Sequence, residues 1–199
     1  MSLLAAALLA AAISSAVPPP ASKADVRKKQ AAAAAIDARR ADLASLADEV
    51  WGFAETALRE TRSAALLADY AEKQGFRVER GVAGMPTAFV ASYGQGRPVI
   101  AVLGEYDALP GLSQKAVPER AVLVEGAPGH GCGHNLFGAA SLGAAIAVKE
   151  QIAAKHVGRT VRVVRDEVAG VRLENDVTAV GADRAVAGLE AALAVSGHA

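Results

Sequence analysis

The sequence predicts an α/β fold, a three-layer sandwich built around a mixed, mostly parallel β-sheet. Segments with helical spacing alternate along the chain with short runs that have the spacing of strands. One of these runs, residues 97–106, is apolar along its centre, which is typical of a strand buried on both faces. Hydrophobic residues make up 52% of the 199 residues, enough to fill the core of one domain of ordinary size.

Two helices are expected before the first strand. Between residues 31 and 58, apolar side chains recur every three or four positions, with Ile36, Leu43 and Val50 on one face. A second helix is expected over residues 63–74, which a glycine follows directly.

The period then changes from that of a helix to that of a strand. Residues 76–80 and 87–94 alternate between apolar and polar side chains, and the apolar run 97–106 follows them. Residues 94–96, Gly-Gln-Gly, predict a turn, so the last two strands are expected to form a hairpin-like pair. Residues 107–133 have no period and contain many glycines and prolines, which indicates a long loop of the kind that often carries function.

A long helix should follow this loop and run to about residue 155, with Asn135 as its N-cap. Its small residues, such as Gly138 and Gly143, would let a neighbouring element approach closely. A further strand is expected at residues 160–164. Because ligands of such sheets bind outside the carboxyl ends of the strands, GEYDALP at the end of one strand and GHGCGHN at the end of its loop are expected at one edge.

The stretch GHGCGHN has the residue types of a metal site. Its glycines alternate with three possible ligands, His130, Cys132 and His134, which would share one side of an extended backbone. Thiolate and imidazole are good ligands for zinc and similar metals. Glu105 and Asp107 are the nearest carboxylates that could complete such a site or orient an imidazole.

Two other interpretations of this stretch stay open on the residues alone. Cys132 could be a small buried hydrophobic residue in a glycine-rich turn. It could also be a nucleophile with a neighbouring histidine as its base, although the sequence shows no third group to orient that base. A nucleic-acid partner is not expected, because 21 basic and 21 acidic residues leave a formal net charge of zero.

The N-terminal segment predicts either export or a disordered extension. An apolar run from Leu3 to Val17 precedes three prolines and is shorter than the roughly 20 residues that span a bilayer, so no stable membrane span is expected. Ser14 to Ala16 offers small residues of the kind found at signal-peptide cleavage sites, although no basic residue precedes the run. We therefore assign residues 1–30 to a signal peptide or extension. The first implies a periplasmic or extracellular location, and the second a cytoplasmic one.

Four motifs in a fixed order carry a resemblance to a known family: WGFAET, GMPTAF, GEYDALPGLSQ and GHGCGHN. In this order they resemble the amidohydrolase branch of the M-twenty metallopeptidases, and within it the group of aminobenzoyl-glutamate utilisation B proteins. The likeness covers about residues 36–164. It identifies residues 31–164 as similar to the N-terminal part of a metallopeptidase catalytic domain, with a zinc-peptidase-like fold.

The resemblance implies a hydrolase with two divalent metal ions, zinc or manganese. Its substrate would be a small-molecule amide: an N-acyl amino acid, aminobenzoyl-glutamate or a small dipeptide. It implies that Cys132 and His134 are metal ligands, and that Asp107 is the catalytic aspartate that orients the metal centre. His130 has no ligand role in the resemblance, and relatives are homodimers.

The resemblance ends after residue 164. Relatives then carry a Pro-Ala-Glu-Glu element with the general base and a metal ligand, where this chain has Ala169 and Gly170. The later histidine ligands and the dimerisation domain also lack counterparts. We interpret residues 165–199 as a divergent tail, for which a frameshift is one hypothesis. The alternative function is then a truncated, catalytically silent fragment.

Overall fold

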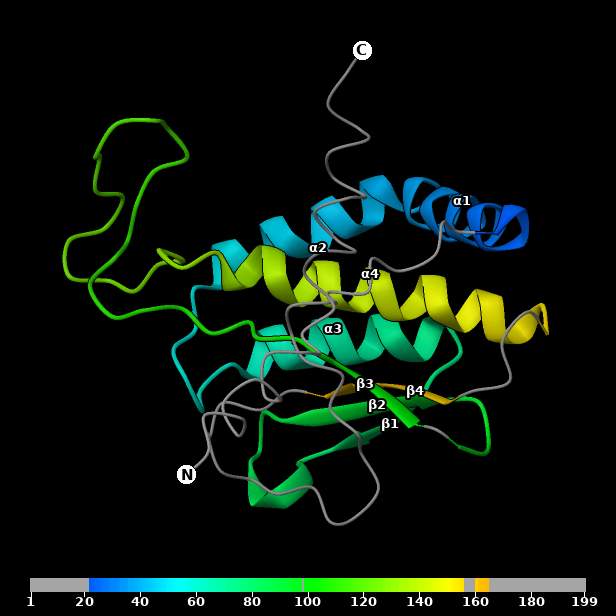
Figure 1. Cartoon of the computed structure of the whole chain (residues 1–199). Coiled ribbons are helices and arrows are strands. Elements are labelled where there is room, and N and C mark those ends of the chain that lie inside the picture. Colours follow the sequence, from blue (N-terminus) through cyan, green and yellow to red (C-terminus); the bar gives the residue numbers. More distant parts are fainter. Residues whose placement is uncertain (1–21, 98, 156–159, 165–199) are drawn as a thin grey trace, which may run out of the picture.

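Figure 1 shows the computed structural model of the chain, which describes residues 22–97, 99–155 and 160–164. The elements of these residues, in chain order, are α1 (Lys23–Asp37), α2 (Arg40–Phe53), α3 (Thr61–Lys73), β1 (Arg77–Arg80), the short 3₁₀ helix η1 (Val82–Gly84), β2 (Phe89–Tyr93), β3 (Val99–Leu103), α4 (His134–Ala153) and β4 (Thr160–Val164). The cleavage region predicted near Ser14, and the divergent tail with Ala169 and Gly170, lie outside the described residues.

The four strands form one mixed sheet in the order β1-β2-β4-β3. Ala91 of β2 is paired with Val78 of β1 on one side and with Val163 of β4 on the other, both in antiparallel register. Strands β3 and β4 are parallel. The α/β class and the mixed sheet are therefore confirmed, but two of the three pairings among the described strands are antiparallel, so a predominance of parallel pairing is wrong for this part of the chain.

The predicted hairpin between residues 87–94 and 97–106 is also wrong. Strand β4 lies between β2 and β3 and is hydrogen-bonded to both. The chain leaves β3, returns through helix α4 and enters the sheet beside β3, which is the crossover that parallel strands require. The short turn between β2 and β3 thus joins two strands that are separated in space by a third.

All the described α-helices lie on one face of the sheet (Figure 1). Helices α3 and α4 contact the strands, and α1 and α2 pack against α4. The core between these layers contains the following buried side chains: Leu46, Val50, Leu67, Phe76, Phe89, Tyr106, Leu142, Ile146 and Val161. Among the described residues no α-helix covers the opposite face, so the third layer of the expected sandwich is not seen there.

The single helix predicted over residues 31–58 is in fact two helices. Helix α1 starts at Lys23, within the segment assigned to residues 1–30, and the oxygen of the Ser22 side chain accepts a hydrogen bond from its first turn. The chain breaks at Arg39, whose side chain donates to the carbonyl of Ala35 and forms an ion pair with Glu150 of α4. The apolar spacing continues across this break, which is why the spacing alone does not reveal it.

Helix α4 is the central helix of the fold, and its small residues allow the close contacts that were expected. A Cβ atom at Gly138 would lie 2.9 Å from the carbonyl oxygen of Glu105, and one at Gly143 would lie 2.8 Å from Leu43. By length and composition α4 is the one helix in the described residues that is long and apolar enough to cross a membrane. Half of that window is buried inside the structure, so its packing in the core already accounts for its composition.

The N-cap of α4 is Gly133, with φ 80°, and not Asn135 as expected. The amides of Leu136 and Phe137 donate to the carbonyl of Gly133, so the helix begins with backbone groups alone. Asn135 is the second residue of the helix, and its side chain donates instead to the carbonyl of Ala47 in α2, at 3.3 Å. The left-handed glycine replaces the side-chain cap because it already turns the chain into the helix.

Candidate metal centre

The candidate site lies where the loop after β3 meets the loop before α4. Leu109 and Gly129 exchange two backbone hydrogen bonds of 3.0 Å, which hold the two stretches side by side. Gly129 is buried at this crossing, and a Cβ atom there would lie 2.2 Å from the carbonyl oxygen of Leu112. The sequence-based expectation that GEYDALP and GHGCGHN meet at one place is therefore confirmed, and the glycine is needed for the close approach.

His134 stands at the centre of the site, between two carboxylates. Its Nδ1 atom lies 2.7 Å from Oδ1 of Asp107, and its Nε2 atom lies 3.1 Å from Oε2 of Glu105. The His134 and Asp107 side chains are 20% and 13% exposed, so water screens this contact only in part. A neutral imidazole carries one N–H and can donate to only one of the two carboxylates. The other contact therefore needs a second proton or a cation.

The two carboxylates reach the site because the residue between them faces the core. Tyr106 is 1% exposed, and its hydroxyl donates to the carbonyl of Thr87 at 2.6 Å. The Thr87 hydroxyl in turn donates to Glu60, which is completely buried, at 2.8 Å. In an extended chain the neighbours of an inward side chain point away from the core, and this places Glu105 and Asp107 together on the side of His134.

Cys132 is a free, exposed thiol. In an extended GHGCGHN stretch, His130, Cys132 and His134 would all face one side, but the two histidines have different hydrogen-bond partners. The ring of His130 lies against α2, while that of His134 lies against Asp107. Gly133 has φ 80°, so the backbone is not extended between Cys132 and His134, and the alternation of sides fails at this point.

His130 is the residue of this stretch to which the resemblance assigns no ligand role. Its Nε2 atom lies 3.0 Å from the carbonyl oxygen of Val50, which means that Nε2 carries the proton and Nδ1 is the acceptor. The Nδ1 atom is buried and has no hydrogen-bond partner among the described residues. Burial lowers the pKa of His130, although the hydrogen bond to Val50 and the negative charge of Asp107 oppose this effect.

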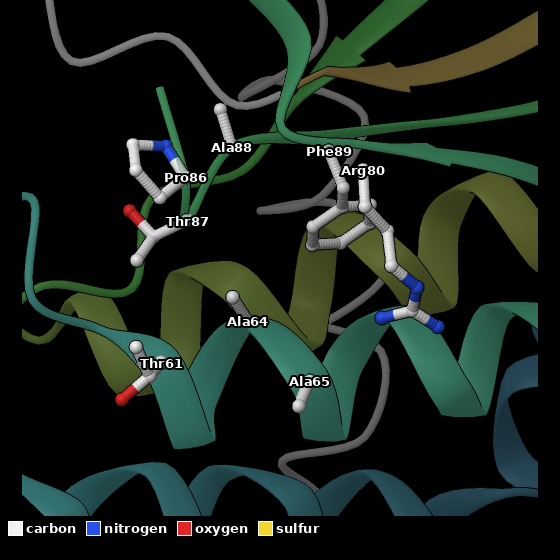
Figure 2. Close-up of a pocket in the computed structure, with 8 residues that line it drawn as sticks. All are labelled: Thr61, Ala64, Ala65, Arg80, Pro86, Thr87, Ala88 and Phe89. Carbon is white, nitrogen blue, oxygen red and sulfur yellow. The ribbon is translucent and has the colours of Figure 1, made fainter. Parts of the chain in front are cut away.

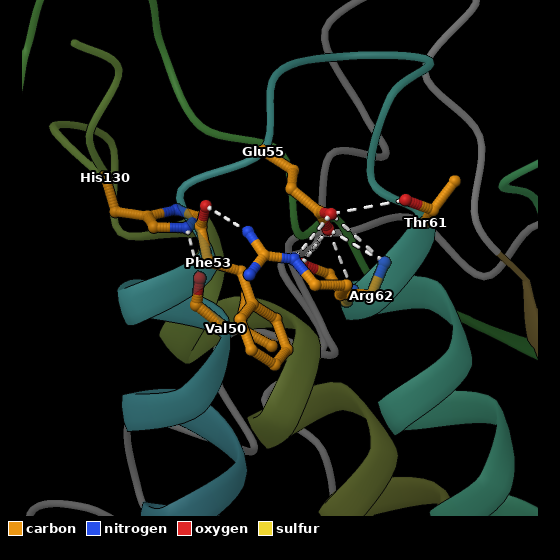
Figure 3. Close-up of polar contacts among 7 residues, drawn as sticks. Val50, Phe53, Glu55, Thr61, Arg62 and His130 are labelled. Carbon is orange, nitrogen blue, oxygen red and sulfur yellow. Dashed lines mark hydrogen bonds and ion pairs between the residues drawn. The ribbon is translucent and has the colours of Figure 1, made fainter.

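The WGFAET motif covers the end of α2 and the turn that follows it, and this turn is hydrogen-bonded to the loop that carries Asp107. The carbonyl of Glu55 accepts a hydrogen bond from Ala108, next to Asp107, at 2.7 Å. The Glu55 carboxylate accepts hydrogen bonds from the backbone amides of Arg62 and Ser63 and from the Arg62 side chain, and so caps α3 (Figure 3). Burial alone would raise the pKa of Glu55, but these hydrogen bonds outweigh it and hold the pKa below its usual value.

The Arg62 side chain links this turn to the end of α2. Its guanidinium lies 4.6 Å from the centre of the Phe53 ring and donates to the carbonyl of Phe53 at 3.2 Å (Figure 3). The sequence contains the motif but gives no local signal for this capping role, because Glu55 acts on a helix that begins six residues later.

A small pocket lies apart from the candidate ligands. Figure 2 shows it between α3 and the segment that leads into β2, with a volume of about 150 Å³. It is lined by Thr61, Ala64, Ala65, Arg80, Pro86, Thr87, Ala88 and Phe89. Its lining contains none of Glu105, Asp107, Cys132 or His134, so we do not assign it to the metal centre.

The donor types around His134 fit a divalent metal. Imidazole, thiol and carboxylate are the ligands that zinc takes in proteins, and a carboxylate on the second ring nitrogen is the usual partner of a ligating histidine. Asp107 provides that partner. The described part of the chain has no group of three or more His, Cys, Asp or Glu side chains placed to hold a metal. The residues described thus fit part of a metal centre and not a complete one.

Comparison with known proteins first identifies the class of fold. The YXEP protein of Bacillus subtilis, described as a dinuclear metal-binding peptidase from the M-twenty family, superimposes with a TM-score of 0.55 at 25% sequence identity. The match covers 65% of this chain and 35% of that one. A protein of methicillin-resistant Staphylococcus aureus, described as an aminohydrolase, gives a TM-score of 0.58 at 19% identity over 71% of this chain and 36% of that one, a likeness of fold alone. The chain has the α/β fold of M-twenty peptidase domains.

A curated relative then confirms the more specific resemblance. Over 129 residues the chain is 50% identical to one of the subunits of the p-aminobenzoyl-glutamate hydrolase of Escherichia coli. The matched region is 64% of this chain and 27% of the relative, so the chain spans little more than a quarter of the relative's length. No family model matches the chain.

Proposed function

We propose that the chain functions as part of a metal-dependent amidohydrolase. The enzyme would hydrolyse the amide bond of p-aminobenzoyl-glutamate, another N-acyl amino acid or a small dipeptide. The 50% identity to the hydrolase subunit supports the reaction class. The observation that carries the proposal is the position of His134, whose two ring nitrogens face Asp107 and Glu105. A ring held in this way has the arrangement of a metal-ligating histidine, with one nitrogen oriented by a carboxylate and the other directed at a site that favours a cation.

In this proposal Asp107 orients the candidate ligand. Its carboxylate accepts a hydrogen bond from Nδ1–H at 2.7 Å and so fixes the tautomer of His134. The lone pair of Nε2 then faces the Glu105 carboxylate at 3.1 Å, and a cation between these two groups would stabilise both. We assign His134 and Cys132 as ligands, with Glu105 as the nearest further oxygen donor, in a centre of two divalent ions, zinc or manganese. A bound divalent ion supplies Lewis acidity toward the substrate carbonyl.

A catalytically silent chain is the second candidate, and one observation favours it. The described residues include no group of three or more His, Cys, Asp or Glu side chains placed to hold a metal ion, and the thiol of Cys132 is exposed. The nucleophilic-cysteine alternative has less support, because the described hydrogen bonds of His130 and His134 go to Val50, Asp107 and Glu105 and none of them reaches the thiol.

We further propose a small-molecule substrate and no nucleic-acid partner, since the formal net charge is zero. Homodimer formation, as expected of relatives, is a proposal for the complete protein. Export through an N-terminal signal peptide is proposed from the apolar run Leu3 to Val17, and sequencing the N-terminus of the mature protein tests it.

The test of function uses the full chain, purified and dialysed against zinc or manganese. We expect bound metal by mass spectrometry, and hydrolysis of p-aminobenzoyl-glutamate that a chelator abolishes. Cys132→Ser should reduce both, while Ser45→Ala, an exposed change on α2, should reduce neither. Wild-type protein that retains no metal and shows no turnover would contradict the proposal and support the silent chain.

A further inference from the structure

Two side chains on either side of the candidate ligands reach the same helix. His130 precedes Cys132 by two residues, and its Nε2 donates to the carbonyl of Val50 at 3.0 Å (Figure 3). Asn135 follows His134 directly, and its side-chain amide donates to the carbonyl of Ala47 at 3.3 Å. The segment that carries both candidate ligands is therefore fastened to α2 at each of its ends.

The two accepting carbonyls belong to residues on the buried side of α2. Ala47 and Val50 are 4% and 0% exposed and lie three residues apart, close to one helical turn. Val50 also accepts from the amide of Ala54, which closes the helix. Asn135 is itself only 7% exposed, so its amide would lose a hydrogen bond in a place where water cannot easily replace it.

The residues between the two ends have little conformational preference of their own. Gly131 and Gly133 flank Cys132, and glycine restricts the backbone less than any other residue. A Cβ atom at Gly131 would meet only the Leu112 side chain, whose terminal methyl would lie 2.7 Å away, so the packing of the neighbouring loop does little to fix this backbone. The order of this segment must therefore come from contacts outside it.

We propose that His130 and Asn135 are positioning residues, a two-point anchor on α2 that fixes the backbone between them so that Cys132 and His134 are presented to a divalent cation. The anchor acts through hydrogen bonds to the Val50 and Ala47 carbonyls and touches neither substrate nor metal. The metal readout of this inference rests on the proposed function, whereas its effect on the order of the segment does not.

The first experiment measures the order of the segment in metal-free full-length protein. In His130→Ala and Asn135→Ala, we expect faster amide hydrogen exchange at residues 129–136. The loss of one buried hydrogen bond corresponds to an increase of about 2–10-fold in local opening. His130→Gln has an amide nitrogen at the position of Nε2 and should restore slow exchange, while Ser45→Ala controls for changes on α2.

The second experiment measures zinc affinity by competition with a chromophoric chelator. We expect His130→Ala to weaken binding by about 10–100-fold, as is usual for residues that hold a ligand in place, and His130→Gln to recover most of the loss. Wild-type protein without zinc affinity would contradict the proposed function. The anchor would then be tested by the amide hydrogen exchange of the first experiment alone. Unchanged exchange in both alanine variants, or equal loss in His130→Ala and His130→Gln, would overturn the anchor. Circular dichroism confirms that each variant is folded, and Asn135→Ala replaces His130→Ala if the latter is not.

Discussion

Nδ1 of His134 lies 2.7 Å from Oδ1 of Asp107, a contact that joins the two stretches that meet at the candidate site. The two residues are 27 positions apart in the chain: Asp107 lies in the loop after β3, and His134 is the first residue of α4. A carboxylate in this position controls which ring nitrogen of His134 carries the proton, and so which nitrogen is available to a metal.

Replacing Asp107 by asparagine should weaken metal binding with little change of shape. The side chain keeps its size but loses the negative charge that holds the Nδ1 proton of His134. We expect zinc affinity to fall by about 10–100-fold. Isothermal titration of zinc into apo wild type and Asp107→Asn measures this change, with Asp42→Asn on the exposed face of α2 as the control. Equal affinities in wild type and Asp107→Asn would remove Asp107 from the centre.

Replacing Gly129 by alanine should destabilise the fold, because the new Cβ atom would lie 2.2 Å from the carbonyl oxygen of Leu112. The strain of moving a backbone segment is expected to cost about 1–3 kcal/mol. Gly52→Ala is the matched control: no atom lies within 4 Å of a Cβ there, and Gly52 is an exposed position inside α2. Urea unfolding should show Gly52→Ala to be as stable as wild type or more stable, by up to about 1 kcal/mol. A Gly129→Ala variant as stable as wild type would mean that the two loops are not packed this closely.

The pKa of Glu55 is lowered in the folded state, so this residue stabilises the fold at pH values above the pKa of an unfolded glutamate. The stabilisation is lost as the pH falls through the lower, folded pKa, because the carboxylate must then be protonated. Glu55→Gln should therefore be less stable than wild type by about 1–2 kcal/mol at neutral pH. The difference should shrink below about pH 4.5. Denaturation at a series of pH values measures this difference, and a constant difference down to pH 3 would contradict this role.

Tyr106→Phe removes the buried hydroxyl that donates to the carbonyl of Thr87 at 2.6 Å. Because Tyr106 is 1% exposed, the loss should destabilise the protein by about 1–2 kcal/mol. Tyr70→Phe is the control, since the Tyr70 hydroxyl makes a longer, more exposed contact of 3.3 Å with Asp42 and should cost less than about 0.5 kcal/mol. Thermal unfolding of the two variants compares them directly, and equal effects would show that burial of the hydroxyl does not matter.

Much of the fold was predictable from local spacing. The strands expected at 76–80 and 160–164, and the helix expected at 63–74, agree with β1, β4 and α3 within about two residues. These elements have a clear period and are bounded by turn residues. The order of the strands was not predictable in the same way. Residues 94–96 look like a hairpin turn, and nothing local shows that β4 is inserted beside them.

In the candidate site, too, some features were predictable from the sequence and others were not. The residue types at Asp107, Cys132 and His134 could be selected from the sequence, and the meeting of their loops followed from the sheet rule. Whether Cys132 and His134 share a side could not be predicted, because it depends on the left-handed conformation of Gly133. The contact of His130 with α2 was also hidden, since it joins residues 80 positions apart.

The place of β4 inside the sheet determines when this part of the molecule can become ordered during synthesis. Strands β2 and β3 are made early but are not neighbours, and each needs β4 to cover one of its edges. A ribosome must therefore release residues 160–164 before the two older strands can be joined, and until then both present unpaired backbone groups. A nascent chain stalled before that point should need protection from self-association, whereas one stalled beyond it should not.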